Sequence, residues 1–181
     1  MRLSRRSSPR EAGGTAYLRV VEQARQAAFF TDCGVPDTVD GRFELICLHA
    51  FLYLHRLKSE RPEAEPIAQA FFDAMFIDMD RALREMGVGD LSVGREVKRM
   101  ARAFYGRVRA YEEGLAGDDD ALAAALCRNL YGTVPGPLPG ADAVAAYARR
   151  EAERLVGQDR VALLAGRVCF GAPPAPPRAL T

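Results

Sequence analysis

A cluster of basic residues in the middle of the chain has the residue types best suited to binding chemistry. Six cations fall between positions 95 and 109, opposed only by Glu96: Arg95, Lys98, Arg99, Arg102, Arg107 and Arg109. An arginine guanidinium binds carboxylates and phosphates bidentately, so this surface suits an acidic protein, anionic headgroups or ribosomal RNA. The simpler alternative is a solvated helix face. The candidate partner-binding residues of this basic face are Arg95, Lys98, Arg99, Arg102 and Arg109.

A second candidate surface is a loop followed by an unusually apolar segment. Asp37 and Arg42 flank the end of this loop, and eleven of the fifteen residues from 43 to 57 are apolar, Phe51 and Tyr53 among them. A helix with this much apolar surface has enough for a partner as well as for the core. The alternative assigns Phe51 and Tyr53 to the core and gives the loop ordinary turn chemistry, with Asp40 as the helix N-cap.

The sequence offers little material for catalysis or for a bound cofactor. Its only histidines, His49 and His55, are six residues apart and share no helix face, and no E-x-x-H motif accompanies them. The glycines of GVGDLSVG (87–94) follow a helical segment and have the wrong spacing for a dinucleotide fingerprint. We therefore expect no catalytic residues, no metal and no cofactor. A haem-handling role for His49 or His55 is the less favoured alternative, and His49 is interpreted as a core or interface histidine.

Composition and charge describe one folded domain. The 181 residues are 49% hydrophobic and 27% charged, which excludes a disordered chain. The net charge of +1 excludes nucleic-acid binding that depends on the overall charge of the protein. No apolar run approaches the roughly 18 residues that a membrane span needs. The four cysteines are dispersed and form no C-x-x-C pair, which is typical of reduced thiols in the cytoplasm.

The elements that would position these residues are helices. Apolar residues recur at helical spacing from Thr15, a plausible N-cap, to about Leu164, and no segment has the pattern of a strand. Six helices are expected, at about 15–33, 41–58, 66–86, 92–115, 120–131 and 141–164, the last broken near Gly157. The predicted fold is an all-α, single-domain bundle over 15–165. Residues 1–14 are expected to be flexible, and the Pro-rich residues 166–181 disordered.

Three segments carry a resemblance to a known family. They are GVPDTVDGRFELICLHAFLYLHRL (34–57), FFDAMFIDMDRALREMGVGDLSVGREVKRMARAFYGRVRAY (71–111) and RNLYG (128–132). Their content and order closely resemble the ubiquinol–cytochrome c chaperone family over residues 15–132. This resemblance implies an all-α protein without enzymatic activity that helps newly made cytochrome b enter respiratory complex III.

The resemblance also implies partners. They are cytochrome b or another bc1 complex subunit, the ribosome or a membrane surface, and a small helper protein, but not DNA. Mitochondrial members of the family have a long N-terminal extension that is not seen here, which favours a cytoplasmic setting, peripheral at the inner membrane. An RNA- or ribosome-binding module built on the basic residues is the competing interpretation.

A chaperone for a membrane protein needs an apolar groove with adaptable side chains. Thioethers and aromatic rings repack at little cost, so the groove candidates are Met75, Met79, Met86, Met100, Phe72, Phe76 and Phe104. The alternative places the same residues in the core of the bundle.

Overall fold

The computed structural model describes residues 7–132, 134 and 138–174. Over these residues the chain forms α-helices and one 3-10 turn and no strand, which confirms the all-α class. In chain order the elements are α1 (Pro9–Ala24), α2 (Ala28–Thr31), α3 (Val39–Leu57), η1 (Lys58–Glu60), α4 (Glu65–Glu85), α5 (Asp90–Ala116), α6 (Asp119–Leu130), α7 (Pro139–Val156) and α8 (Arg160–Leu164). The six long helices correspond to the six that the sequence predicts, and the predicted break at Gly157 separates α7 from α8.

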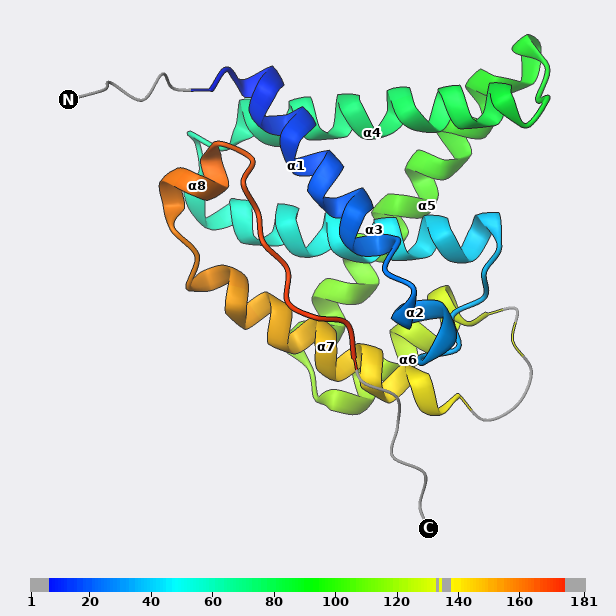
Figure 1. The fold of residues 1–181 in the computed structure, drawn as a ribbon, viewed down its shortest axis with the longest axis vertical. Coiled ribbons are helices and arrows are strands. Elements are labelled where there is room, and N and C mark those ends of the chain that lie inside the picture. Colours follow the sequence, from blue (N-terminus) through cyan, green and yellow to red (C-terminus); the bar gives the residue numbers. More distant parts are fainter. Residues whose placement is uncertain (1–6, 133, 135–137, 175–181) are drawn as a thin grey trace.

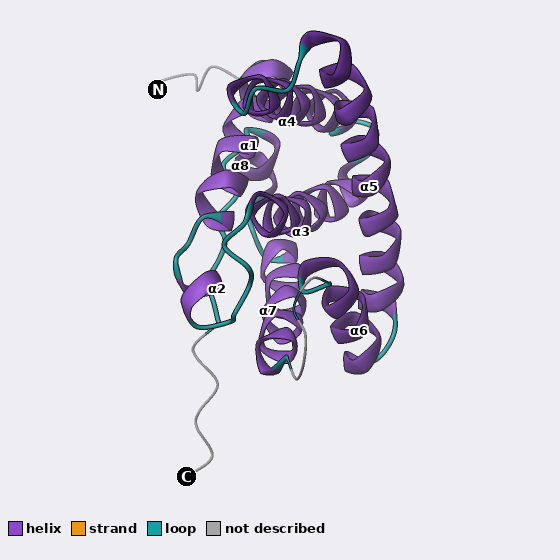
Figure 2. Cartoon of the chain, turned by 90° about the vertical axis from the view of Figure 1, so that its right-hand side faces the viewer, coloured by secondary structure: helices purple, strands orange, loops and turns teal. Residues whose placement is uncertain are grey.

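The apolar helix α3 lies at the centre of the molecule (Figure 1). α4 lies on one side of it and α7 on the other, while α1 contacts both α3 and α4. The longest helix, α5, runs from α4 to α6 along the side of α3 that is opposite to α1 (Figure 2). Thus α1 and α5 connect α3 with α4 from two sides.

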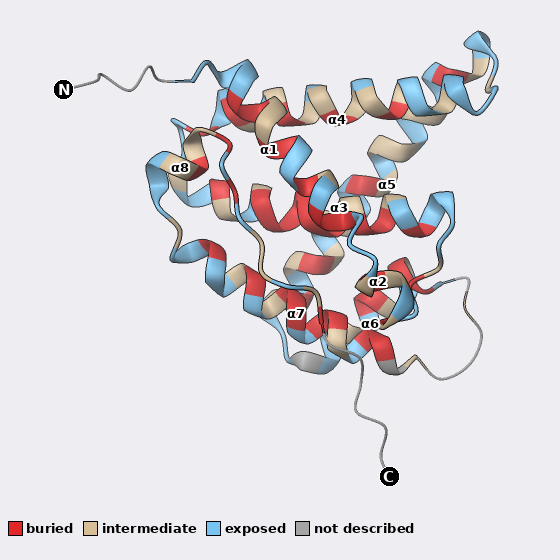
Figure 3. Ribbon diagram, viewed as in Figure 1, coloured by how far each residue is buried: buried red, intermediate tan, exposed pale blue. Residues whose placement is uncertain are grey.

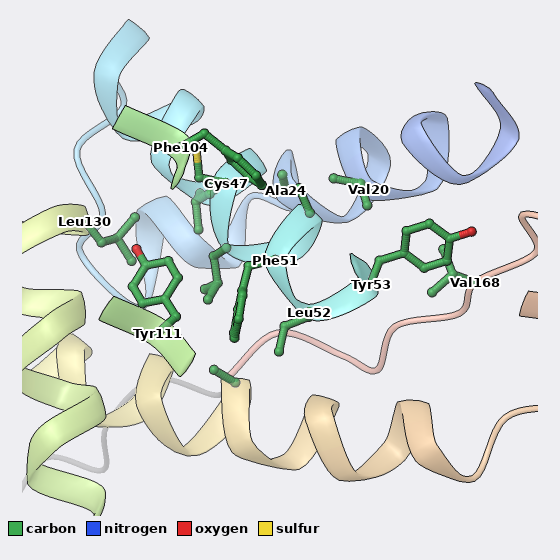
Figure 4. Close-up of a cluster of buried hydrophobic side chains, with 14 of the residues drawn as sticks. Val20, Ala24, Cys47, Phe51, Leu52, Tyr53, Phe104, Tyr111, Leu130 and Val168 are labelled. Carbon is green, nitrogen blue, oxygen red and sulfur yellow. The ribbon is translucent and has the colours of Figure 1, made fainter. Parts of the chain in front are cut away.

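The hydrophobic core surrounds α3, where the burial colours of Figure 3 are densest. Phe51 packs against Tyr111 of α5 with ring centroids 5.6 Å apart, and Tyr53 packs against Phe71 of α4 at 5.4 Å. Figure 4 shows how side chains from α1, α3, α5, α6 and the C-terminal segment meet here. A helix that is apolar on most of its surface is stable only in such surroundings.

The first helix begins six residues earlier than expected. Ser8, not Thr15, is its N-cap: the Ser8 hydroxyl accepts from the Glu11 amide, and the Glu11 carboxylate accepts from the Ser8 amide. This capping box, with Pro9 at the first helical position, starts the helix with a turn that has no large apolar side chain. Residues 9–14, expected to be flexible, are therefore helical.

The C-terminal segment also departs from the prediction. Residues 166–174 are not in a helix, yet they pack on the bundle, with Val168 buried and the Gly171 amide donating to Glu151 Oε2 at 2.7 Å. Gly166 makes this return possible, because its φ of 77° suits glycine and a Cβ there would lie 2.0 Å from the Ala12 carbonyl oxygen. The rest of the predicted disordered tail, 175–181, lies outside the described residues.

Two predictions of helix ends were wrong, one at α3 and one at the first helix. The N-cap of α3 is Thr38, whose hydroxyl accepts from the Gly41 amide at 3.1 Å, rather than Asp40. The first predicted helix also ends earlier, at Ala24, and the four-residue helix α2 follows it.

Candidate partner-docking site

A groove of about 600 Å³ opens between the first half of α3, the second half of α4 and the first half of α5. We call it the α3–α4–α5 groove, and Figure 2 views the side of the molecule on which these three helices meet. The end of α6 and Tyr17 and Arg25 from the α1 segment complete it. Its size is in the range of pockets that hold small ligands or the anchoring side chains of a partner.

Apolar side chains from three helices line this groove. Met79, Met86 and Met100 come from α4 and α5, and Phe43 and Ile46 come from α3. At its edge, Val39 and Met86 are more than half exposed to solvent. Exposed apolar side chains around a concave surface are typical of a site that receives an apolar partner.

A buried ion pair forms one wall of the groove. Glu44 of α3 is 5% exposed, and both of its carboxylate oxygens accept from the guanidinium of Arg107 in α5. Arg107 also donates to the Ala103 carbonyl at 2.9 Å and lies over the Phe43 ring. Burial raises the pKa of Glu44 despite the opposing effect of Arg107. The pair joins α3 to α5, and removing one partner would leave an unpaired buried charge.

Charged side chains surround the opening of the groove. Arg42 donates to Asp37 at 2.7 Å, and the Tyr17 hydroxyl donates to Asp78 at 2.8 Å. Arg25 and Arg128 also line the groove and form no ion pair within the part of the chain that the structure describes. The groove therefore combines an apolar lining with guanidinium groups at its edge.

The predicted basic residues divide between two faces of α5. Arg99 lines the groove and is paired with Glu96 at 2.7 Å. The other four are exposed and do not line the groove: Arg95, Lys98, Arg102 and Arg109. Arg107, the sixth cation of the run, is the half-buried partner of Glu44 and lines the groove with it.

The second predicted surface is only partly at the groove. Arg42 lines the groove and Asp37 holds it in place, as an exposed pair. Phe51 and Tyr53 are 1% and 0% exposed, so their assignment to a partner surface is corrected: they are core residues. Their side chains fall on the faces of α3 that α5 and α4 cover.

The groove candidates among the methionines and phenylalanines also separate. Met86 and Met100 line the groove, Met79 reaches it from the core at 5% exposed, and Met75 and Phe104 are buried in the core. Sequence reasoning missed Val39, Arg25 and Arg128, which reach the groove from the ends of three elements. Helical periodicity carries no signal for such residues, because their positions depend on how the helices cross.

His49 is part of a buried hydrogen-bond network. Its Nδ1 donates to the Leu45 carbonyl at 2.7 Å, so its Nε2 must accept from the Tyr147 hydroxyl at 2.9 Å. Gln23 donates to the same hydroxyl and to the Gly171 carbonyl. Burial lowers the pKa of His49 to about 4. Since both ring nitrogens are occupied, the geometry does not favour the haem-ligand alternative for His49.

Two general properties of the described residues bear on function. Within 7–132, 134 and 138–174, no helix is both long enough and apolar enough to cross a membrane. The same residues contain no group of three or more His, Cys, Asp and Glu side chains arranged to hold a metal ion.

Comparison with known proteins identifies the family. The model of the family described as Ubiquinol-cytochrome C chaperone matches residues 31–170, which include α3 to α8 and the whole groove except its α1 side. The chain belongs to the ubiquinol–cytochrome c chaperone family. The family resemblance seen in the three sequence segments is thereby confirmed.

Relatives within this chaperone family are found in animals, yeast and bacteria. The chain is 32% identical over 114 residues to ubiquinol-cytochrome-c reductase complex assembly factor 1 of Xenopus laevis, covering 63% of this chain and 57% of that protein. It is 30% identical over 107 residues to the mitochondrial protein CBP3 of Saccharomyces cerevisiae, covering 58% and 32%. The chain thus matches between about a third and just over half of these relatives.

A solved structure has the same fold. The crystal structure of the Cbp3 homolog from Brucella abortus is 41% identical to this chain, with a TM-score of 0.81 and 91% of each chain covered. Members of the chaperone family therefore share this helical architecture.

Proposed function

We propose that this chain is an assembly chaperone of the bc1 complex that binds a newly made subunit, cytochrome b first among the candidates. It acts by protein–protein contact and not by catalysis. The proposal is supported by membership of the chaperone family and by relatives whose names describe assembly factors of ubiquinol–cytochrome c reductase. A small helper protein and a location at the membrane surface belong to the same proposal.

The observation that carries the proposal is the apolar α3–α4–α5 groove with three methionines in its lining. A membrane subunit exposes apolar helix before its partners arrive, and an apolar helix binds to proteins by laying its apolar face into a groove. Methionine is unbranched and polarisable, so it adapts to different client side chains. Arg42, Arg99 and Arg128 at the edge would bind carboxylates of the client's flanking loop.

Capture from solubilised membranes tests this role with a matched pair of variants. Val39→Glu with Met86→Glu puts two carboxylates at the edge of the groove. Val156→Glu with Val161→Glu makes the same change at two equally exposed valines on α7 and α8, away from it. The tagged wild type and the control are expected to recover cytochrome b or another bc1 subunit. The groove variant is expected to recover at least about tenfold less of that subunit, because a carboxylate is costly to bury in an apolar contact.

The outcomes separate the candidate functions. Equal recovery by the groove variant and the control would contradict the groove as client site. Recovery of ribosomes or RNA without any bc1 subunit would favour the competing RNA-binding role of the basic residues.

A further inference from the structure

One exposed face of α5 has a regular pattern of its own. Its exposed residues follow spacings of four, three, four, three and four, which places them in one line along the helix: Leu91, Arg95, Lys98, Arg102, Tyr105 and Arg109. We call this line the outer α5 stripe. It is about 27 Å long, because Leu91 and Arg109 are 18 residues apart and each residue of a helix adds about 1.5 Å.

The cations of the outer α5 stripe are largely uncommitted. Lys98 and Arg102 make no hydrogen bond or ion pair within the described residues, and Arg95 approaches Glu96 only to 4.0 Å. Arg109 is paired with Glu113 at 2.9 Å. Since exposed ion pairs are weak and Lys98 and Arg102 have none, the stripe presents net positive charge to whatever approaches it.

Two apolar side chains project from the same line. Leu91 is 101% exposed. Tyr105 is 59% exposed, and its ring also contacts Phe72 of α4, with the centroids 6.0 Å apart. Exposing a leucine to water is unfavourable, and its transfer into a lipid interface is favourable. Tyrosine is enriched at the headgroup level, and basic side chains beside it bind anionic headgroups.

We propose that the outer α5 stripe docks this chain on an anionic membrane surface. Headgroups require only a line of positive charge and shallow insertion of apolar side chains, and the stripe offers both on a straight helix. RNA is the weaker candidate, because phosphates and bases offer nothing to an exposed leucine.

The stripe lies beside the groove, so docking on a membrane would bring the groove close to a membrane-bound client. This link between docking and client binding rests on the proposed function. α5 contributes Arg99, Met100 and Ala103 to the groove, and the stripe residues Lys98 and Arg102 are their neighbours along the same helix. A chain lying on the membrane through this stripe holds the groove at headgroup level. An apolar client segment that leaves the bilayer reaches the groove without crossing water.

Flotation with lipid vesicles tests the docking without any client. The wild type is expected to float with vesicles containing phosphatidylglycerol, not with pure phosphatidylcholine vesicles, and to be released by high salt. Lys98→Glu with Arg102→Glu is expected to weaken binding at least about twentyfold, since one cation near an anionic surface changes affinity about fivefold. Leu91→Ser with Tyr105→Ser is expected to weaken binding at every salt concentration.

A control variant excludes a general effect of net charge. Arg10→Glu with Arg167→Glu changes the net charge by the same amount, on exposed arginines of α1 and of the segment after α8 that are not part of the stripe. It is expected to bind vesicles better than the stripe variant by at least about tenfold. Equal binding by these two variants, equal binding to neutral vesicles, or binding to RNA but not to vesicles would each overturn the proposal.

The stripe variant is expected to keep client capture in detergent, where no bilayer is present. Loss of vesicle binding with capture intact therefore supports the docking stripe. Failure of client capture by the wild type would contradict the proposed function and leave the vesicle result standing by itself.

Discussion

Several buried polar side chains of this protein, His49 and Glu151 among them, are paired with specific partners. His49 lies in the most apolar helix, yet Leu45 and Tyr147 satisfy its two ring nitrogens. Glu151 is fully buried and accepts from the Gly171 amide at 2.7 Å. A fully satisfied buried network is rigid and specifies how its elements pack. These residues therefore hold α1, α3, α7 and the C-terminal segment together.

The lowered pKa of His49 makes stability depend on pH. The native histidine stays neutral down to about pH 4, while the unfolded one binds a proton near pH 6.5. Its contribution is thus complete above pH 6.5 and is lost as the pH falls toward 4. Between pH 7 and pH 5 we expect His49 to account for a loss of about 2 kcal/mol in the free energy of unfolding.

Urea denaturation of the wild type and of His49→Gln measures this contribution. Glutamine keeps hydrogen-bonding groups at the position but does not titrate, so its stability is expected to fall less steeply over the same pH range. Parallel pH profiles for the two proteins would show that His49 is not the titrating group.

At the scale of the elements, the crossing of α1 over α4 depends on a single glycine. A Cβ on Gly13 would lie 2.5 Å from the Phe71 amide nitrogen and 2.7 Å from the Ala70 Cβ. The neighbouring Gly14 has no such contact within 4 Å. The close approach also positions Tyr17 at the groove, where its hydroxyl reaches Asp78.

This difference gives a matched pair of substitutions. Gly13→Ala is expected to destabilise the fold by about 1–3 kcal/mol, because the two helices must separate. Gly14→Ala is expected to stabilise it by up to about 1 kcal/mol through helix propensity. Urea midpoints of the two variants test the crossing, and equal effects of the same sign would contradict it.

The elements were largely predictable from local sequence, and the exceptions have local physical causes. Long apolar periodicity located the six long helices, and Gly157 located a break. The start of α1 was missed because a capping box and Pro9 support a turn that has little apolar surface. The packed residues 166–174 were missed because their contacts, such as Gly171 with Glu151, are made across the fold and leave no periodic signal.

The candidate site was less predictable than the helices for a geometric reason. Arg102 and Arg107 belong to one basic run, but the crossing of α5 over α3 pairs Arg107 with Glu44 in the groove and leaves Arg102 exposed outside it. Phe51 is of a residue type that often binds partners, yet α5 covers it. Which face of a helix is buried was thus inferred correctly for most positions, whereas the groove exists only once five helices, α1 and α3 to α6, are assembled.

At the scale of the whole molecule, the central claim is that one groove receives a client for bc1 complex assembly. The architecture serves this claim because α3 supplies the core, while α4 and α5 extend past it to form the groove walls. The 0.81 TM-score to the Brucella abortus Cbp3 homolog shows that a relative has the same arrangement of helices.

The most direct test is photo-crosslinking in cells that are assembling the bc1 complex. A photoreactive amino acid would replace Met86 at the edge of the groove in one protein and Val161 of α8 in another. Both side chains are more than half exposed, so neither replacement disturbs the core. We expect position 86, and not position 161, to form an adduct with cytochrome b or another bc1 subunit. Adducts of equal yield at both positions, or no bc1 subunit at position 86, would contradict the account.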